Sequence, residues 1–435
     1  MRSTGKSAAS NPVWVCSELY YPEDTSTGFF LTHIAEALAA EPGLRVSALC
    51  ARPTYAHRGA LVPAEEVRNG VRIVRCRATT LDRERLATRL VNLVTISASM
   101  FWTALRRCER GSCIVVVTNP PLLPALMALV ARMRGCRCVL LVHDVYPDVL
   151  EVAGLIAPSG TAARLIRRAW GYFLRRMTAV VVLGRDMRER LLAVEPGIAG
   201  RTRIVTNWAD DDEVRPVPKA GTELVRRLGL ADRFVVQLSG NIGRTHDAGV
   251  VARCVRRLRG PEGDRVHLLV ASSGRGSDAI RAGLDETDLG RVTFLDRQPR
   301  GALNDLLNAC DVALIPFVRG MAGLSVPSRM YNLMAAARPI VAVADRRSEL
   351  ALVLEEEDAG WVVEPGDDAG LARLLSSLSR SPAEVARRGA NAARAARQRY
   401  ARGLVLDRWR ELVAAQFAEG AEKTAADGVR RVGHA

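Results

Sequence analysis

The sequence predicts an α/β protein with two Rossmann-like domains that face each other across a cleft. Short apolar runs alternate with amphipathic helical patterns, which is typical of parallel sheets with crossover helices. The alternation occurs twice, on either side of a turn-rich, acidic and then proline-rich stretch over residues 207–218. At 435 residues the chain is also too long for one ordinary hydrophobic core. We therefore expect two domains in succession, joined by that stretch.

In the first half, strands are predicted where β-branched and other apolar residues cluster. Amphipathic patterns between them predict helices, for example over Phe29–Ala39 and Asp186–Leu192. The predicted strands are Val13–Cys16, Val46–Cys50, Val71–Arg75, Ile114–Thr118, Cys138–His143, Ala179–Leu183 and Arg203–Val205.

The second half repeats this alternation and ends in helices. Residues 382–417 carry an alanine- and arginine-rich helical pattern that is broken near Tyr400–Gly403, and a polar tail follows. We place the first domain at residues 1–212, the second at 213–395, a C-terminal helix at 396–418 and a flexible tail at 419–435. The predicted strands of the second domain are Phe234–Leu238, Val266–Ser272, Val292–Leu295, Asp311–Pro316, Ile340–Ala344 and Gly360–Val363.

The chain is strongly basic, and most of the excess charge lies in the first half. Lys and Arg number 62 against 47 Asp and Glu, a net charge of +15, and residues 1–210 hold 28 basic and 17 acidic residues. Such a field favours an anionic partner, such as lipid headgroups, phosphorylated lipid or nucleic acid. A general drift toward arginine is the alternative, since only Lys6, Lys219 and Lys423 are lysines.

Cysteine usage and hydropathy indicate the compartment. The nine cysteines are scattered, with no C-x-x-C pair and no Cys/His cluster at zinc spacing, so we expect reduced thiols and no metal. The first 16 residues contain no long apolar segment typical of a signal peptide, and no run approaches 18 uncharged apolar residues. The expected location is the cytoplasm, with peripheral association at the inner face of the plasma membrane as an open alternative.

The stretch Pro316–Ala344 predicts an anion site. A strand ends in a glycine-bearing loop that includes Leu324 and Ser325, and Ser328 stands where a helix N-cap is expected. The first helical turn presents free backbone N–H groups, and Arg329 in that turn adds a cation suited to phosphate. The sequence therefore predicts a phosphorylated ligand in the second domain.

A second turn at a strand end supports this site. Gly240 and Gly243 follow the first strand of the second domain, with Asn241 between them, and allow a ligand close to the backbone. Arg244 and His246 can supply charge there. The alternative is a simple tight turn. The pattern is not G-x-x-x-x-G-K-[ST], so ATP hydrolysis of that class is not expected.

Two further motifs follow strands of the first domain. Thr25–Gly28 opens the first helix, where Gly28 could let a sugar or phosphate approach, although an ordinary strand-to-helix turn explains it equally well. His143 and Asp144 follow an apolar strand, and polar groups at such a strand end are candidates for chemistry. The alternative is that Asp144 caps the next segment and His143 is a satisfied strand-end residue.

Two basic, apolar segments raise the possibility of a membrane surface. In Ala163–Met177, Trp170 belongs to an apolar stripe, and Arg164, Arg168 and Arg175 line another face. Residues 81–107 are also basic and apolar, with Phe101 and Trp102 near their end. Basic faces with aromatic residues suit a membrane interface, whereas a crossover helix with a solvated arginine face is the alternative. No RNA-binding consensus, zinc finger or groove-reading pattern is present, so no nucleic-acid partner is expected.

Five motifs occur in an order and spacing that resemble one family. Over about residues 11–418 the chain resembles the retaining, nucleotide-sugar-dependent glycosyltransferases of family four. The closest likeness is to the branch that builds bacterial cell-surface polysaccharides, related to the colanic acid and O-antigen fucosamine-type transferases. The resemblance implies the GT-B fold, with C-terminal helices that cross back to the first domain. The motifs are Tyr20–Glu23 with Gly28, His143–Asp148, Asn207–Asp210, Ser239–Arg244 and Val326–Asn332.

The resemblance also implies roles for single residues. Ser239–His246 would lie against the donor diphosphate, and Arg329 would contact the diphosphate or a sugar hydroxyl. Gly28 would let the donor sugar reach the first domain. His143 would contact the sugar near its anomeric centre, with Asp144 beside it.

The chain departs from the family pattern at two places. The family has two glutamates eight positions apart, where this chain has Leu324 and Asn332; Asn332 can still hydrogen-bond ribose, without charge. The family also has an arginine and a lysine in the first loop of the second domain, where this chain has Asn241 and His246. More of the phosphate charge would then fall to Arg244 and Arg329.

The function predicted from these features is transfer of a hexose-type sugar, with retention, from a nucleoside diphosphate sugar to a lipid-linked saccharide. The nucleotide is expected to be UDP, and the setting cell-surface polysaccharide biosynthesis. No cofactor is expected, because the nucleotide-sugar is a substrate. Two alternatives stay open: a UDP-sugar epimerase of similar fold, and an inert sugar-nucleotide-binding subunit of a polysaccharide assembly complex.

Overall fold

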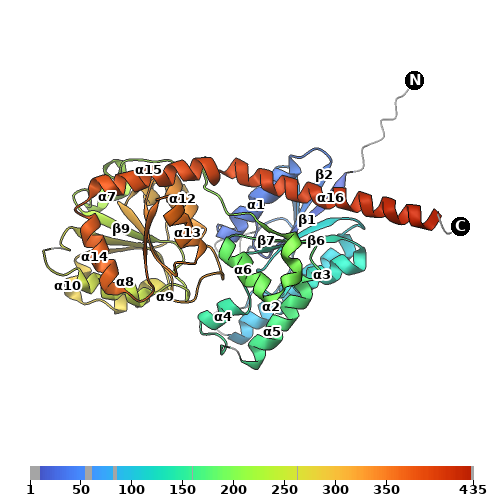
Figure 1. Cartoon of the computed structure of the whole chain (residues 1–435), viewed down its shortest axis with the longest axis horizontal. Coiled ribbons are helices and arrows are strands. Elements are labelled where there is room, and N and C mark those ends of the chain that lie inside the picture. Colours follow the sequence, from blue (N-terminus) through green and yellow to red (C-terminus); the bar gives the residue numbers. More distant parts are fainter. Residues whose placement is uncertain (1–9, 54–60, 82–85, 159, 262, 433–435) are drawn as a thin grey trace, which may run out of the picture.

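The computed structural model describes residues 10–53, 61–81, 86–158, 160–261 and 263–432. Within these residues the strands form two sheets, each flanked by helices, and helices α15 (Pro382–Arg399) and α16 (Arg402–Val432) run along both (Figure 1). Helix α16 packs against α1 (Ser26–Ala39) of the first domain. The predicted fold class, two Rossmann-like domains with C-terminal helices crossing back to the first, is therefore confirmed.

The first sheet has eight strands within the described residues, in the order β3-β4-β2-β1-β5-β6-β7-β8. Every neighbouring pair is parallel except β3 and β4. Parallel strands buried on both faces read as continuous apolar runs, which is why composition predicted them. The strands are β1 (Asn11–Cys16), β2 (Leu44–Ala51), β3 (Glu65–Arg68), β4 (Val71–Cys76), β5 (Cys113–Val117), β6 (Arg137–Val142), β7 (Ala179–Val182) and β8 (Thr202–Ile204).

Strand β3 was not predicted. It is a short antiparallel edge strand of sequence EEVR, and its exposed charged residues give no apolar run. A two-residue turn joins it to β4: Asn69 and Gly70 both have positive φ, 47° and 79°. This is the backbone that an Asn-Gly hairpin turn adopts, so the dipeptide was the available signal.

The second sheet has six strands in the described part of the chain, all parallel, in the order β11-β10-β9-β12-β13-β14. The order reverses direction between β9 and β12, which is where ligands bind in open α/β sheets. The strands are β9 (Phe234–Ser239), β10 (Val266–Ala271), β11 (Val292–Leu295), β12 (Val312–Pro316), β13 (Ile340–Val343) and β14 (Gly360–Val363).

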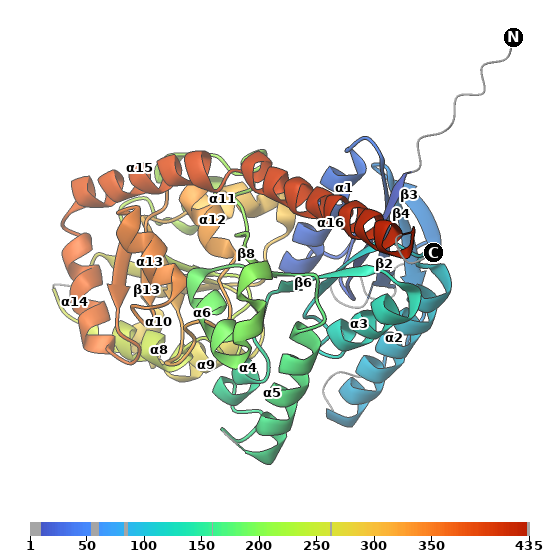
Figure 2. The same cartoon turned by 45° about the vertical axis from the view of Figure 1, so that its right-hand side comes forward.

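Helices cover both faces of each sheet. On the outside of the first domain, α2, α3 and α5 lie next to one another (Figure 2). In the second domain, α8 packs against α9 and α14, and α12 packs against α15. The remaining α-helices are α2 (Leu86–Arg107), α3 (Leu123–Arg134), α4 (Asp148–Val152), α5 (Thr161–Leu174), α6 (Arg185–Val194), α7 (Glu223–Leu228), α8 (Ala248–Arg257), α9 (Arg275–Ala282), α10 (Glu286–Leu289), α11 (Leu303–Asn308), α12 (Arg329–Ala335), α13 (Glu349–Glu356) and α14 (Asp368–Leu378).

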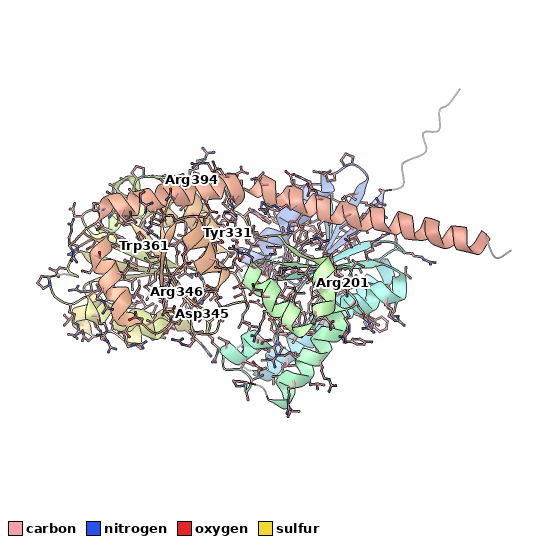
Figure 3. The ribbon with its side chains drawn as sticks, viewed as in Figure 1. Arg201, Tyr331, Asp345, Arg346, Trp361 and Arg394 are labelled. Carbon is pink, nitrogen blue, oxygen red and sulfur yellow. The ribbon has the colours of Figure 1, made fainter. Side chains whose placement is uncertain are left out.

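The two C-terminal helices join at the predicted break. Tyr400 lies between them, and its ring is 5.2 Å from that of the buried Tyr331 on α12 (Figure 3). Helix α16 extends to Val432, beyond the point where a polar tail was predicted to begin. Residues 419–432 are rich in Ala, Glu, Lys and Arg, which favour helix. Residues 433–435 of the predicted tail lie outside the described part.

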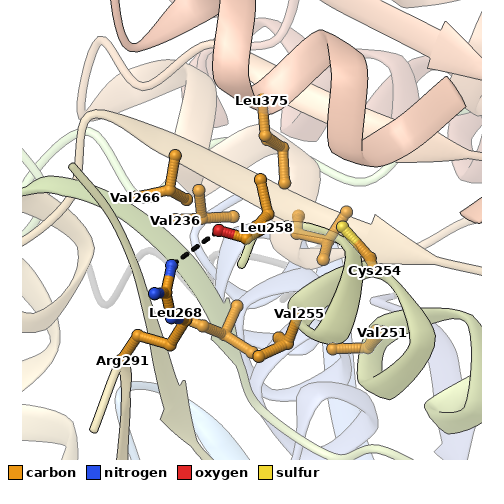
Figure 4. A pocket seen from close by; sticks show the side chains of 10 residues that line it. Val236, Val251, Cys254, Val255, Leu258, Val266, Leu268, Arg291 and Leu375 are labelled. Carbon is orange, nitrogen blue, oxygen red and sulfur yellow. Dashed lines mark hydrogen bonds between the residues drawn. The ribbon is translucent and has the colours of Figure 1, made fainter. Parts of the chain in front are cut away.

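A small apolar cavity lies in the core of the second domain. It lies between α8 and the sheet and is lined mainly by aliphatic side chains, with Arg291 at its edge donating to the Leu258 carbonyl at 2.7 Å (Figure 4). Its volume of about 10 Å³ is no larger than a water molecule requires. We therefore assign it to core packing and look for the ligand site elsewhere.

Candidate active site

The predicted site residues meet where the carboxyl ends of the strands of the two sheets approach each other. The Ser26 hydroxyl of the first domain lies 2.8 Å from the Ser328 hydroxyl of the second. Beside it, the backbone N–H of Val145 donates to the Leu324 carbonyl at 2.9 Å. These contacts bring the loop before α12 against the N-terminus of α1 and the end of β6.

Arg329 lies at the centre of the second-domain part of the site. Its Nη1 donates to the Ser239 carbonyl, and its Nη2 donates to the Asn241 carbonyl at 3.0 Å. Nη2 also lies 3.1 Å from Nε2 of His246. Burial lowers the pKa of Arg329 to about 10, which leaves the guanidinium charged at neutral pH. The side chain thus presents a fixed cation at the end of β9.

The loop after β9 has the close approach that was predicted for its glycines. Gly240 has φ of +95°, and a Cβ there would lie 3.4 Å from Cζ of Arg329. A side chain at this position would be strained and would press on the guanidinium. Gly243 and Arg244 are exposed, and Arg244 forms no ion pair with the described residues. Asn241 is exposed and contributes its carbonyl to Arg329.

Gly28 lies in the first turn of α1. Its N–H donates to the hydroxyl of Thr25, the N-cap residue, at 3.1 Å. A Cβ at Gly28 would lie 2.8 Å from the Glu23 carbonyl, closer than any real contact. The glycine is therefore required by the turn itself, whatever it does for a ligand.

His143 and Asp144 follow β6, and the same hydroxyl holds both. Thr118 Oγ1 accepts from the backbone N–H groups of His143 and Asp144 at 3.1 and 3.2 Å. The imidazole Nδ1 lies 3.4 Å from Thr27 Oγ1, and Nε2 is buried with no hydrogen-bond partner in the described part of the chain. An unpartnered polar atom of this kind is costly unless a ligand uses it.

Burial controls the charge of this pair. It lowers the pKa of His143 to about 4 and raises the pKa of Asp144 to about 6. At neutral pH the imidazole is therefore neutral and the carboxylate is ionised. A neutral His143 can donate or accept a hydrogen bond, and an ionised Asp144 can stabilise positive charge close to it.

The structure places the remaining predicted residues less directly in the site. Ser328 precedes α12, but its side chain makes no capping hydrogen bond and contacts Ser26 instead. The Leu324 side chain is buried in the core, so only its backbone faces the first domain. The Asn332 amide oxygen accepts from the N–H of Asp210 at 2.8 Å, so it binds the linker. Ser325 is partly buried in the same loop.

One residue that holds the two domains together was missed. Asp186, in the first turn of α6, is buried, and its Oδ2 accepts from the N–H groups of Gly323 and Glu349 at 2.8 and 2.9 Å. Its Oδ1 accepts from the N–H of Met187 at 2.7 Å. Both Gly323 and Glu349 belong to the second domain. An aspartate just after a strand was the available signal, as it was at Asp144.

A polar cavity of about 300 Å³ lies beside α1, between the two domains and the linker. Gly28 and Phe29 line it from α1, and Arg300 from the second domain. Arg300 pairs with the buried Asp210 at 2.6 Å, and its guanidinium carbon lies 4.0 Å from the centre of the Phe29 ring. Small-molecule ligand pockets in proteins usually have volumes of about 300 Å³ or more. Among the described residues, no group of three or more His, Cys, Asp or Glu could hold a metal ion.

The predicted membrane surface needs one correction. Trp170 is only 9% exposed, and its ring stacks at 6.2 Å on that of Tyr146, so it cannot reach a membrane. It lies on the stripe of α5 that faces the interior. Arg164 and Arg168 are exposed, and Arg175, also exposed, forms an ion pair with Glu195.

A different apolar stripe is exposed on the neighbouring helix α2. Leu90, Val91, Val94 and Trp102 are between 44% and 54% exposed, although large apolar side chains at this spacing usually face a core. Leu129 and Met133 on α3, which contacts α2, and Leu165 on α5, which contacts α3, are also exposed. In the part of the chain that the structure describes, no helix has the length and apolar character needed to cross a bilayer.

Comparison with known proteins identifies the family. Residues 27–208 match the "Glycosyl transferase 4-like domain" model, and residues 233–381 match the "Glycosyl transferases group 1" model. WbjE of Pseudomonas aeruginosa, named as a glycosyltransferase, is 32% identical over 272 residues, covering 62% of this chain and 67% of that protein. The chain is a family-four glycosyltransferase of GT-B fold. Enzymes of this family use nucleotide-sugar donors.

Other similar proteins agree with this assignment. WcaI of Escherichia coli strain K12, whose name assigns it to colanic acid biosynthesis, is 26% identical over 349 residues, covering 77% of this glycosyltransferase and 84% of that protein. The solved structure of HepE from Anabaena, in complex with UDP and glucose, matches with a TM-score of 0.67 at 14% identity. The match covers 94% of this chain and 100% of the HepE chain. At that identity the likeness supports the fold alone.

Proposed function

We propose that this glycosyltransferase moves a hexose-type sugar from a UDP-sugar to a lipid-linked saccharide during cell-surface polysaccharide biosynthesis, with retention of configuration. The observation that carries the proposal is the contact between Ser26 and Ser328. It joins the loop of Arg329, a fixed cation, to the helix that begins beside His143. A diphosphate at Arg329 would thus place its sugar toward the first domain. The names of WbjE and WcaI support glycosyl transfer, and the name of WcaI supports a role in polysaccharide biosynthesis. HepE, which shares the fold, was solved in complex with UDP and glucose.

The chemistry follows from the charges at the site. Arg329 and the exposed Arg244 would stabilise the diphosphate as it leaves with negative charge. In a front-face reaction the departing diphosphate itself assists deprotonation of the acceptor hydroxyl. His143 would then orient the sugar through the Nε2 atom that has no protein partner. Asp144, ionised at neutral pH, would stabilise positive charge at the anomeric carbon.

The donor site is tested by replacing Arg329. Arg329→Ala should weaken UDP binding by about 1.5–3 kcal/mol, the range for a charged hydrogen bond, which corresponds to roughly 10- to 150-fold. Arg329→Lys should recover only part, because one ammonium cannot replace the planar fork. Isothermal calorimetry measures both. Arg319→Ala is the matched control, since Arg319 belongs to the same loop but donates to the Pro365 carbonyl at 2.8 Å. Equal affinity in the wild type and Arg329→Ala would remove Arg329 from the site.

Activity separates this proposal from the two alternatives. An epimerase would convert UDP-sugar with no acceptor present, and an inert subunit would bind donor without turnover on any lipid-linked acceptor. A transferase converts donor only when an acceptor is supplied. Mass spectrometry of lipid-linked saccharides from cells with and without the gene for this chain would show which saccharide gains a sugar.

We further propose that the surface formed by α2, α3 and α5 docks on an anionic membrane. A lipid-linked acceptor keeps its lipid in the bilayer, so the first domain must come to the membrane surface. The apolar stripe of α2, with Trp102 54% exposed, can insert shallowly, and Arg164 and Arg168 add positive charge nearby. Each cation close to an anionic surface contributes about 1 kcal/mol. Charge complementarity therefore favours anionic lipid.

Flotation with lipid vesicles tests this surface. We expect binding to anionic vesicles that is weak on neutral ones and that falls as salt rises. Arg164→Glu with Arg168→Glu should abolish it without changing UDP affinity. Arg227→Glu with Arg373→Glu is the matched control, because both residues are exposed on the second domain and give the same change of charge. Equal flotation with neutral lipid, or none with either, would contradict the proposal.

A further inference from the structure

We propose that His246 is a positioning residue: a neutral imidazole that accepts a hydrogen bond from Arg329 and so fixes the cation for the donor diphosphate. The family resemblance assigns this position to a lysine, which would carry charge itself. In this chain the geometry points to different roles: Arg329 supplies the positive charge, and His246 orients the guanidinium of Arg329. The inference rests on the proposed function, because the site concerned is the proposed donor site.

Three acceptors at the end of β9 and in the loop after it hold the guanidinium. They are the carbonyls of Ser239 and Asn241 and Nε2 of His246, the last at 3.1 Å from Nη2. A guanidinium has five N–H groups. These contacts use three of them, so Nε–H and the second N–H of Nη1 have no hydrogen-bond partner among the described residues. Two donors on a cation of fixed orientation are thus left for a ligand.

The contact with Arg329 also determines the protonation of His246. Arg329 can only donate, so Nε2 of His246 must be the acceptor and cannot carry a proton. The remaining proton then lies on Nδ1, which is 3.3 Å from the hydroxyl of Thr245. This tautomer is assigned from the hydrogen-bond network. Burial, and then the charge of Arg329, lower the pKa of His246 to about 3, in agreement with a neutral ring.

Packing keeps the imidazole in place. Its ring lies 5.2 Å from that of Phe317, and the backbone N–H of His246 donates to the Gly243 carbonyl at 3.0 Å. The next residue, Asp247, caps α8 by accepting from the N–H of Val250 at 2.8 Å. The ring thus packs on Phe317, and the two hydrogen bonds hold the backbone on either side of it. A lysine here would place an ammonium against the guanidinium, and like charges at that separation repel.

The role is tested by binding of UDP-glucose to single and double variants. His246→Ala should weaken binding about fivefold, the size expected for one ordinary hydrogen bond lost indirectly. His246→Gln keeps an acceptor oxygen and should bind within about twofold of wild type, whereas His246→Lys should bind more weakly than His246→Gln despite its extra charge. In an Arg329→Ala background, His246→Ala should have no further effect, because the histidine acts only through the arginine.

A matched control and a measurement without ligand complete the test. His267, on β10 of the same sheet, is buried and neutral, and its Nε2 lies 2.9 Å from the Thr293 hydroxyl. His267→Gln should therefore leave UDP-glucose affinity unchanged. In the ligand-free protein, the ¹⁵N chemical shifts of His246 should show a proton on Nδ1 and none on Nε2. A proton on Nε2 would overturn the inference, and this measurement does not depend on donor binding. If the wild type bound no UDP-glucose, that result would refute the proposed donor and not the role of His246. Equal weakening by His246→Ala with and without Arg329 would show direct contact with the donor and also overturn it.

Discussion

Removing the carboxylate of Asp186 should let the two domains separate. We call the domain arrangement of the structure closed and the separated one open. Its Oδ2 accepts two backbone N–H groups from the other domain, those of Gly323 and Glu349 at 2.8 and 2.9 Å. Burial raises the pKa of Asp186 although these N–H groups lower it, so the group sits in a largely dry interface. In Asp186→Ala the closed arrangement would bury two donors without an acceptor, whereas an open arrangement would expose both to water.

The expected size follows from these two bonds. Hydrogen bonds to charged groups contribute about 1.5–3 kcal/mol each, and removal of the buried charge offsets part of their loss. We therefore expect Asp186→Ala to destabilise the closed arrangement by about 2–4 kcal/mol. If donor binding needs both domains, UDP-glucose affinity falls in proportion to the fraction of molecules that remain closed. A destabilisation of about 2 kcal/mol then lowers the affinity by up to roughly 30-fold.

Two measurements on three variants decide the matter. Calorimetry gives the affinity, and small-angle X-ray scattering gives the radius of gyration, which should rise in Asp186→Ala. Asp186→Asn keeps one oxygen for the cross-domain N–H groups and should change both quantities less. Gly323→Ala keeps the carboxylate but adds a Cβ 2.8 Å from the Asp186 carbonyl, at φ of +75°, and should open the domains too. An unchanged radius and unchanged affinity in Asp186→Ala would refute the reasoning.

Two further predictions concern histidines. His143→Ala should lower the turnover number more than it lowers donor affinity, because Nε2 of His143 has no hydrogen-bond partner among the described residues and would be used mainly in the transition state. Steady-state kinetics gives the turnover number, and calorimetry gives the affinity. Near-normal turnover in the folded variant would make His143 structural. Burial lowers the pKa of His267 to about 4, so the unfolded chain binds more protons and stability falls as pH drops from 6.5 to 4. Urea unfolding of His267→Gln across this range should show a shallower acid loss, by up to about 3 kcal/mol, than the wild type; identical slopes would contradict it.

The strands could be predicted from sequence because a strand that is buried on both faces is a continuous run of apolar residues. Each parallel strand of the two sheets is an apolar run, and the structure has a strand at every predicted place. Strand β3 lies at a solvent-exposed edge and contains no apolar run. Trp170 shows the opposite error: its residue type suggested a membrane, but its position on the stripe shared with Ala163 and Leu174 already indicated the interior.

The site could be predicted only residue by residue. Loops at strand ends can be recognised locally, so His143 and Arg329 were found as candidates. Their partners lie far along the chain: Arg329 meets His246 across 83 positions, and Asp186 meets Gly323 across 137. The first contact depends on β9 and β12 being neighbours in the second sheet, and the second depends on how the two domains pack; no local pattern encodes either. For the same reason His246 was expected to carry charge, whereas the structure places it against a cation.

The asparagine that stands where the family has a glutamate connects the proposed donor site to the linker. Helix α12 carries Arg329 and, three residues later, Asn332, and residues so spaced lie on one side of a helix. Arg329 faces the loop after β9, while Asn332 accepts the N–H of Asp210, whose carboxylate in turn pairs with Arg300. A glutamate at position 332 would bring a second carboxylate near Asp210 at a buried point, which is unfavourable. A neutral amide instead lets one helical turn contact both the loop after β9, through Arg329, and the interdomain linker, through Asn332. We therefore expect movement of the linker to change the position of Arg329.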